Sequence, residues 1–142
     1  MPRVVRLVAA AIAGLVLGSV VNMGLVMVGG SVIPPPNGVD VTSMEGLKAS
    51  LHLFEPKHYL FPFLAHALGT LIGAMVATLL TPGRTSGPAV AVGVLFLLGG
   101  IANAVMLPAA LWFIGVDLVL AYLPAAWLGY RLSKGAATPT TQ

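Results

Sequence analysis

Four polar side chains stand inside otherwise apolar segments, where they are candidates for chemistry. His66 and Asp117 are ionisable, and Asn22 and Asn103 are amides. A charged group deep in lipid costs at least about 2.5–3.5 kcal/mol, so Asp117 has to be protonated, paired or hydrated. His66 is the only titratable partner at a similar predicted depth, and an acid beside an imidazole can take up and release protons. These four residues are therefore candidate binding residues for a proton or a small polar solute.

A purely structural interpretation of the same residues stays open. Polar side chains often hydrogen-bond between membrane helices, with an average contribution of about 0.6 kcal/mol per contact. The four residues would then fix how the helices pack and bind nothing else.

A metal site is a further possibility near the second apolar segment. Its candidate ligands for zinc or iron are His52, Glu55, His58 and His66. The spacing of Glu55 and His58 matches one half of a di-iron motif, but that chemistry uses two such motifs. Because the chain has no cysteine, thiolate ligands and thiol nucleophiles are excluded. No zinc-protease motif, phosphate loop or nucleophile elbow occurs, so the sequence favours a non-enzyme and predicts no cofactor.

The overall composition is typical of a membrane protein. Of the 142 residues, 58% are apolar and 8% are charged, and the mean hydropathy is +0.98. Soluble domains carry about 25% charged residues, which is far more than this chain can present to water. The net charge of +3 comes from scattered residues, so nothing indicates a nucleic-acid partner.

The apolar residues fall into four segments, at about 4–28, 59–80, 88–107 and 109–132. Each has roughly the 20 residues that a helix needs to cross a bilayer. The first segment is too long for the 7–15-residue core of a signal peptide, so we interpret it as a membrane helix. The sequence therefore predicts an all-α membrane protein of one domain, residues 1–142, folded as a four-transmembrane-helix bundle.

The positive charges predict how this bundle is oriented. One set of helix ends carries five basic residues, Arg3, Arg6, Arg84, Arg131 and Lys134. The other set carries only Lys48 and Lys57. Since basic residues favour the cytoplasmic side, we expect a multi-pass protein of the cell (inner) membrane with both termini in the cytoplasm.

The loop at 29–58 is then an outer loop, and its second half has a helical pattern. Thr42 and Glu45 have the spacing of a capping box, which begins a helix. Apolar residues follow at helical spacing, namely Met44, Leu47, Leu51 and Phe54. This pattern predicts a short amphipathic helix on the outer membrane surface.

Small residues share a helical face with each polar residue in the apolar segments. The four sets are Gly14, Gly18 and Asn22; His66, Gly69, Gly73 and Ala77; Gly99, Gly100 and Asn103; and Asp117, Ala121, Ala125 and Gly129. Small residues let membrane helices approach closely. We therefore expect all four polar residues to point into the bundle, in one layer roughly 6–12 Å below the outer surface.

Three stretches carry a resemblance to a known group of proteins: VNMGLVMVGGSVIPPP, FEPKHYLFPFLAHALGTLIGA and FLLGGIANAVMLPA. Together they resemble an uncharacterised family of small bacterial integral membrane proteins with four helices. The resemblance implies the fold class and supplies no activity, cofactor or site.

Two functions of different classes remain. One is proton-responsive binding or transport of a small solute by the polar layer. The other is a non-catalytic structural or accessory subunit that docks other membrane helices through its glycine-rich faces. Beyond the lipid bilayer, the expected partner is a second copy of the chain or another membrane protein.

Overall fold

The computed structural model describes residues 1–136, and all regular structure in that range is helical. The α-helices are α1 (Arg3–Val32), α2 (Met44–Ser50), α3 (Leu60–Leu79), α4 (Gly87–Met106), α5 (Leu111–Leu120) and α6 (Leu123–Gly135). Two 3-10 turns, η1 (Leu51–Leu53) and η2 (Pro56–Tyr59), lie between α2 and α3. The prediction of an all-α fold is confirmed for this range.

Four stretches are long and apolar enough to cross a membrane: Arg3–Val32, Pro56–Leu79, Gly87–Met106 and Leu111–Gly135. They match the four predicted segments, but the first continues to Val32 rather than ending at residue 28. It ends there because Pro34 disfavours the helical conformation at Ile33, whose φ and ψ are −123° and 88°. At 30 residues, α1 is about 45 Å long.

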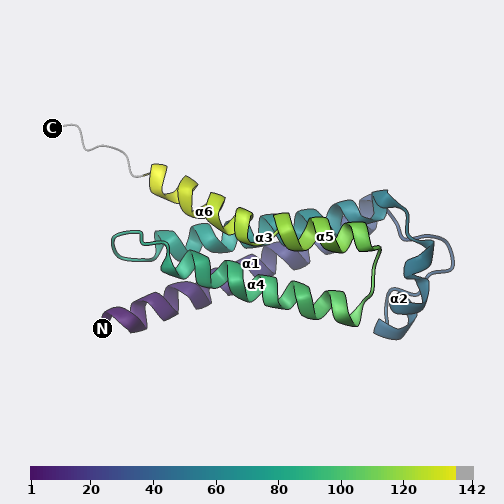
Figure 1. The fold of residues 1–142 in the computed structure, drawn as a ribbon, viewed down its shortest axis with the longest axis horizontal. Coiled ribbons are helices and arrows are strands. Elements are labelled where there is room, and N and C mark those ends of the chain that lie inside the picture. The colour runs from purple at the N-terminus through teal and green to yellow at the C-terminus, as the bar shows by residue number, and fades with distance from the viewer. Residues whose placement is uncertain (137–142) are drawn as a thin grey trace.

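The four candidate spans form one bundle, in which each span runs in the opposite direction to the one before it (Figure 1). The N-terminus, the turn between α3 and α4 and the last described turn of α6 lie at one end. The other end, which we call the loop end, carries α2 and the residue 29–58 loop. Helix α3 is the central element, because α1, α4 and α6 all pack against it.

Glycines set the contact between α1 and α3. A Cβ atom added to Gly18 would lie 2.5 Å from the carbonyl oxygen of Gly69. One added to Gly73 would lie 2.6 Å from the carbonyl oxygen of Gly14. The two backbones are therefore too close for any side chain, and the predicted small-residue face of α3 is confirmed as a tight helix contact.

The fourth predicted helix is two helices, which corrects the expectation of one helix over 109–132. Helix α5 ends at Leu120 and α6 begins at Leu123. Pro124 is the second residue of α6, and it has no N–H to bond to the Leu120 carbonyl, while its ring would clash there. The chain turns at Tyr122, which has φ −115° and ψ −80°.

The loop also differs in detail from the sequence pattern. The N-cap of α2 is Ser43, whose hydroxyl accepts the Gly46 N–H at 3.0 Å. Thr42 does not form the predicted capping box with Glu45; its N–H and hydroxyl both donate to Asp40. These bonds, with a third from the Ser43 hydroxyl, lower the pKa of Asp40. A helix is therefore present in the predicted stretch, but it ends at Ser50, before Leu51 and Phe54 of the predicted apolar face.

Candidate functional site

His66 and Asp117, the two ionisable residues within the apolar segments, are in contact. Nδ1 of His66 lies 2.8 Å from Oδ1 and 3.0 Å from Oδ2 of Asp117. The histidine side chain is 18% exposed and the aspartate side chain 7%. Helices α3 and α5 thus bring together two residues that are 51 positions apart. Each supplies the hydrogen-bonding partner that lipid cannot.

Tyr122 completes this cluster and was missed by the sequence reasoning. Its hydroxyl donates to Oδ2 of Asp117 at 3.0 Å, and its ring stacks on His66 with centroids 5.7 Å apart. In one regular helix Tyr122 would point about 140° away from Asp117, because five residues turn the helix by that angle. The break before Pro124 brings it back, so that proline was the signal in the sequence.

Helix α4 also packs against the cluster. Gly100 lies directly against the Tyr122 ring, and a Cβ atom there would lie 2.7 Å from a carbon of that ring. Thr70 is also buried nearby, but its hydroxyl donates to the His66 carbonyl at 2.7 Å and is thereby satisfied. The tyrosine therefore has little freedom to leave Asp117.

Asn22 lies at the level of this cluster on α1. The pairs Gly14–Gly73 and Gly18–Gly69 define the antiparallel register of α1 and α3, and Asn22 lies beside Gly69, about one helical turn from His66. The Oδ1 atom of Asn22 is buried and has no hydrogen-bond partner in the part of the chain that the structure describes. A buried polar atom without a partner costs about 1–3 kcal/mol, so this oxygen is an available acceptor.

The prediction that Asn103 points into the bundle is wrong. Its side chain is exposed on α4, and the neighbouring Gly99 has nothing within 4 Å of an added Cβ atom. Helix α4 uses Gly100 for its contact with the bundle. Since Asn103 is four residues from Gly99, it shares the outward face of that glycine. The polar layer therefore comprises Asn22, His66, Asp117 and Tyr122.

The metal-site hypothesis is also wrong for these residues. No three histidine, aspartate or glutamate side chains converge to hold a metal ion within residues 1–136. His66 is bonded to Asp117, and Nδ1 of His58 accepts the Glu55 N–H at 2.9 Å. The Glu55 carboxylate instead pairs with Lys57 at 3.2 Å, and His52 is exposed.

Chemically, the cluster holds one carboxylate, one imidazole and one phenol. Nδ1 of His66 and the Tyr122 hydroxyl face the carboxylate, whereas Nε2 of His66 has no hydrogen-bond partner within residues 1–136. This nitrogen and Oδ1 of Asn22 are the two polar atoms left for a further ligand. The arrangement can exchange a proton and can bind a small hydrogen-bonding solute.

Comparisons with protein-family models, with curated proteins and with solved structures gave no match to this chain. The resemblance to small bacterial four-helix membrane proteins therefore stays a prediction from the sequence, and the function has to be argued from the site itself.

Proposed function

We propose that this chain is a multi-pass protein of the cell's inner membrane with both termini in the cytoplasm. Four candidate spans support the membrane location. The arrangement in Figure 1 supports the orientation, because the end with the N-terminus and the last described turn of α6 also carries the five basic residues Arg3, Arg6, Arg84, Arg131 and Lys134. Basic residues favour the cytoplasmic side. The loop end then faces outward.

In this orientation the His66–Asp117–Tyr122 cluster serves proton-responsive binding or transport of a small polar solute. The observation that carries the proposal is the contact of His66 with Asp117, closed by the Tyr122 hydroxyl. His66 is the seventh residue of α3 and Asp117 is the seventh residue of α5. Each therefore lies about 9 Å along its own helix from the first residue, at the loop end. That depth is within reach of the outer side.

A buried polar atom without a partner favours binding over a purely structural role. A structural cluster is expected to satisfy its own polar groups, since each unsatisfied buried group is costly. Here Oδ1 of Asn22 is buried without a partner and lies level with His66. Together with Nε2 of His66, it offers an acceptor and a ring nitrogen to a small polar solute.

A proton changes the net charge of the cluster by one, and this couples it to a charged solute. A cationic solute at the Asp117 carboxylate would displace the proton, so its affinity would rise with pH. An anionic solute would need the protonated imidazole, so its affinity would rise as the pH falls. The sign of the pH dependence therefore identifies the charge of the solute.

The proposal is tested by thermal stability of the purified protein in detergent. Amines, carboxylic acids, amides and sugars are added singly at two pH values, one mildly acidic and one mildly basic. We expect at least one class to raise the melting temperature in a pH-dependent way. The rise should vanish in Asp117→Asn and persist in His52→Gln, a change in an exposed residue outside the cluster. No stabilisation by any class, or an equal rise in Asp117→Asn, would exclude this function.

A second candidate function is that of an accessory subunit. The observation that favours it is the exposed amide of Asn103 beside the open Gly99 on α4, since small and polar residues form contacts between membrane helices. Cross-linking in native membranes tests it. Gly99→Leu should abolish a cross-link that wild type forms through α4, without lowering thermal stability; cross-linking at the wild-type level would exclude this face.

A further inference from the structure

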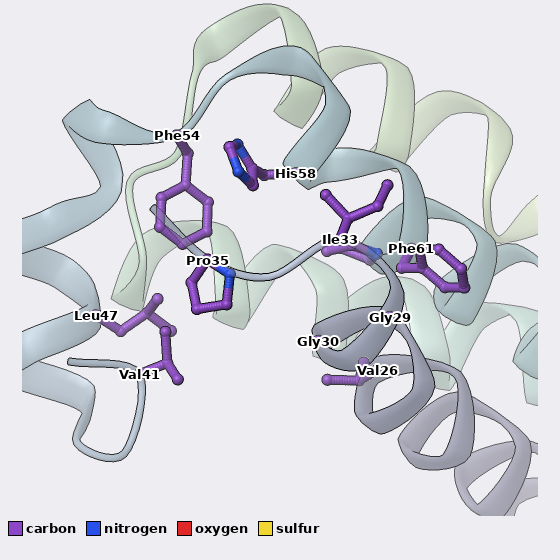
Figure 2. Close-up of a pocket in the computed structure, with 11 residues that line it drawn as sticks. Val26, Gly29, Gly30, Ile33, Pro35, Val41, Leu47, Phe54, His58 and Phe61 are labelled. Carbon is purple, nitrogen blue, oxygen red and sulfur yellow. The ribbon is translucent and has the colours of Figure 1, made fainter. Parts of the chain in front are cut away.

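An apolar cavity lies at the loop end, separate from the His66–Asp117–Tyr122 cluster. Figure 2 shows it between the last turns of α1, the first turns of α3 and the loop that carries α2. Its volume is about 300 Å³. The side chains in Figure 2 reach it from all three segments and include Val26, Ile33, Leu47, Phe54 and Phe61.

Two neighbouring glycines of α1 shape this cavity in different ways. Gly29 holds α1 against α3, because an added Cβ atom would overlap the Phe61 side chain. Gly30 lines the cavity, yet an added Cβ atom there meets nothing within 4 Å. The first glycine is thus needed for packing, whereas the second leaves room that a side chain could fill.

The cavity wall offers one side-chain hydrogen-bonding group, the imidazole of His58. Nδ1 of that ring accepts the Glu55 N–H at 2.9 Å. In the neutral ring, a nitrogen that accepts a hydrogen bond carries no proton, so the proton is on Nε2. His58, which lines the cavity, therefore has one N–H donor, and the other lining side chains are apolar.

The position of the cavity suits a molecule that comes from the bilayer. Helix α1 is about 45 Å long, which exceeds the roughly 30 Å of the hydrocarbon core, so its last turns reach the membrane boundary. At the rim of the cavity, Val26 is 44% exposed and Val41 is 48% exposed. This apolar rim is open to the layer in which the polar groups of lipids meet their hydrocarbon chains.

We propose that this cavity binds a long-chain fatty acid from the outer leaflet, with the alkyl chain in the cavity and a carboxyl oxygen accepting from Nε2–H of His58. The volume is at the lower end of the range for small-molecule pockets, about 300–1,000 Å³, and therefore suits one alkyl chain rather than a two-chain phospholipid. The single donor matches the single polar group of a fatty acid. The site does not depend on the role proposed for the His66–Asp117–Tyr122 cluster, and its assignment to the outer leaflet rests on the proposed orientation.

Photo-cross-linking with a diazirine-labelled fatty acid tests the proposal on the purified full-length protein, with labelled peptides identified by mass spectrometry. Wild type should be labelled on residues 26–33 and 54–61. Gly30→Leu fills the cavity and should lose this labelling. Gly24→Leu is the matched control. Gly24 is also in α1, an added Cβ atom there meets nothing within 4 Å, and Gly24 does not line the cavity. Both changes raise helix propensity, so neither is expected to unfold α1.

A second variant tests the polar contact. His58→Leu should keep the labelled positions but raise the fatty-acid concentration for half-maximal labelling about two- to tenfold, as expected for one hydrogen bond. If Gly30→Leu lowers the melting temperature, Val41→Phe fills the cavity from the exposed rim instead. Equal labelling in wild type and in the filled variant would overturn the site. Preferential labelling of the same residues by a diazirine-labelled phospholipid would overturn the choice of a fatty acid.

Discussion

The Asp117 side chain, which lies on α5, has two hydrogen-bond partners from different parts of the chain. His66 approaches from α3 and Tyr122 from the start of α6. Breaking a buried ion pair by removing one partner costs more than the pair contributes, because a charge is then left stranded. The two partners are therefore expected to behave as parts of one unit.

The first prediction is that His66 and Asp117 are energetically coupled. Asp117→Asn and His66→Gln should each destabilise the protein by about 1.5–3 kcal/mol, the range for hydrogen bonds to charged groups. The double variant should cost much less than the sum, because the second change removes a charge that the first has stranded. A double-mutant cycle on thermal stability measures this, and a coupling within about 0.3–0.5 kcal/mol of zero would show independent residues.

The second prediction concerns the hydroxyl of Tyr122. Tyr122→Phe keeps the ring that packs on Gly100 but removes one donor to Asp117. We expect a loss of about 1.5–3 kcal/mol in the free energy of unfolding, the range for hydrogen bonds to charged groups. Tyr130→Phe is the control for loss of a tyrosine hydroxyl outside the cluster; Tyr130 is partly buried, whereas Tyr122 is fully buried. Equal small losses in both variants would mean that the hydroxyl of Tyr122 contributes nothing special.

Among the elements, α3 carries the tightest contacts. Its glycines meet the backbone of α1, and Gly129 of α6 meets the Leu71 carbonyl on another side of α3. Helices without large side chains between them gain dispersion contacts over their whole length, and this is the main source of association energy within lipid. Any shift of α3 would also move His66.

The third prediction is that Gly73→Leu disrupts this packing. A Cβ atom at position 73 would lie only 2.6 Å from the carbonyl oxygen of Gly14, so the leucine side chain would overlap α1. We expect a loss of at least about 1–3 kcal/mol in the free energy of unfolding. Gly115→Leu is the matched control in α5, where an added Cβ atom meets nothing within 4 Å. If thermal unfolding in detergent shows both variants at the wild-type temperature, the crossing of α1 and α3 is looser than described.

Much of the fold could be predicted from the sequence because apolar length and small-residue spacing decide it. Small residues at a spacing of about four predicted the packing faces of α1, α3 and α5–α6. The same spacing placed His66 and Asp117 on those inward faces. Asn103 could not be placed in this way, since Gly99 and Gly100 allow two faces and only packing selects Gly100. Tyr122 required recognising that Pro124 would end one helix and begin another.

Over the whole molecule, the exposed apolar side chains and the charged residues lie in different regions. Large apolar side chains are exposed along α1 and α4, which is unfavourable in water and favourable in lipid. The polar loop with α2 covers one end, and the basic residues are concentrated at the other. This separation supports one orientation in the membrane over its inverse.

The fourth prediction tests that orientation by cysteine labelling in intact cells. The chain has no native cysteine, so single-cysteine variants give clean signals. A membrane-impermeant maleimide added outside should modify Asn37→Cys in the loop and spare Ser86→Cys between α3 and α4. Both positions are exposed, so reactivity reports the side of the membrane. Modification of Ser86→Cys alone would invert the topology.

The most direct test of the central claim is infrared difference spectroscopy of the protein in sealed, right-side-out proteoliposomes. Only the external pH is lowered. We predict that wild type shows a carboxyl and imidazole protonation signal that disappears in Asp117→Asn, changes in His66→Gln and persists in Glu45→Gln, a change in the exposed loop. An identical difference spectrum for wild type and Asp117→Asn would contradict a proton-responsive cluster at His66 and Asp117.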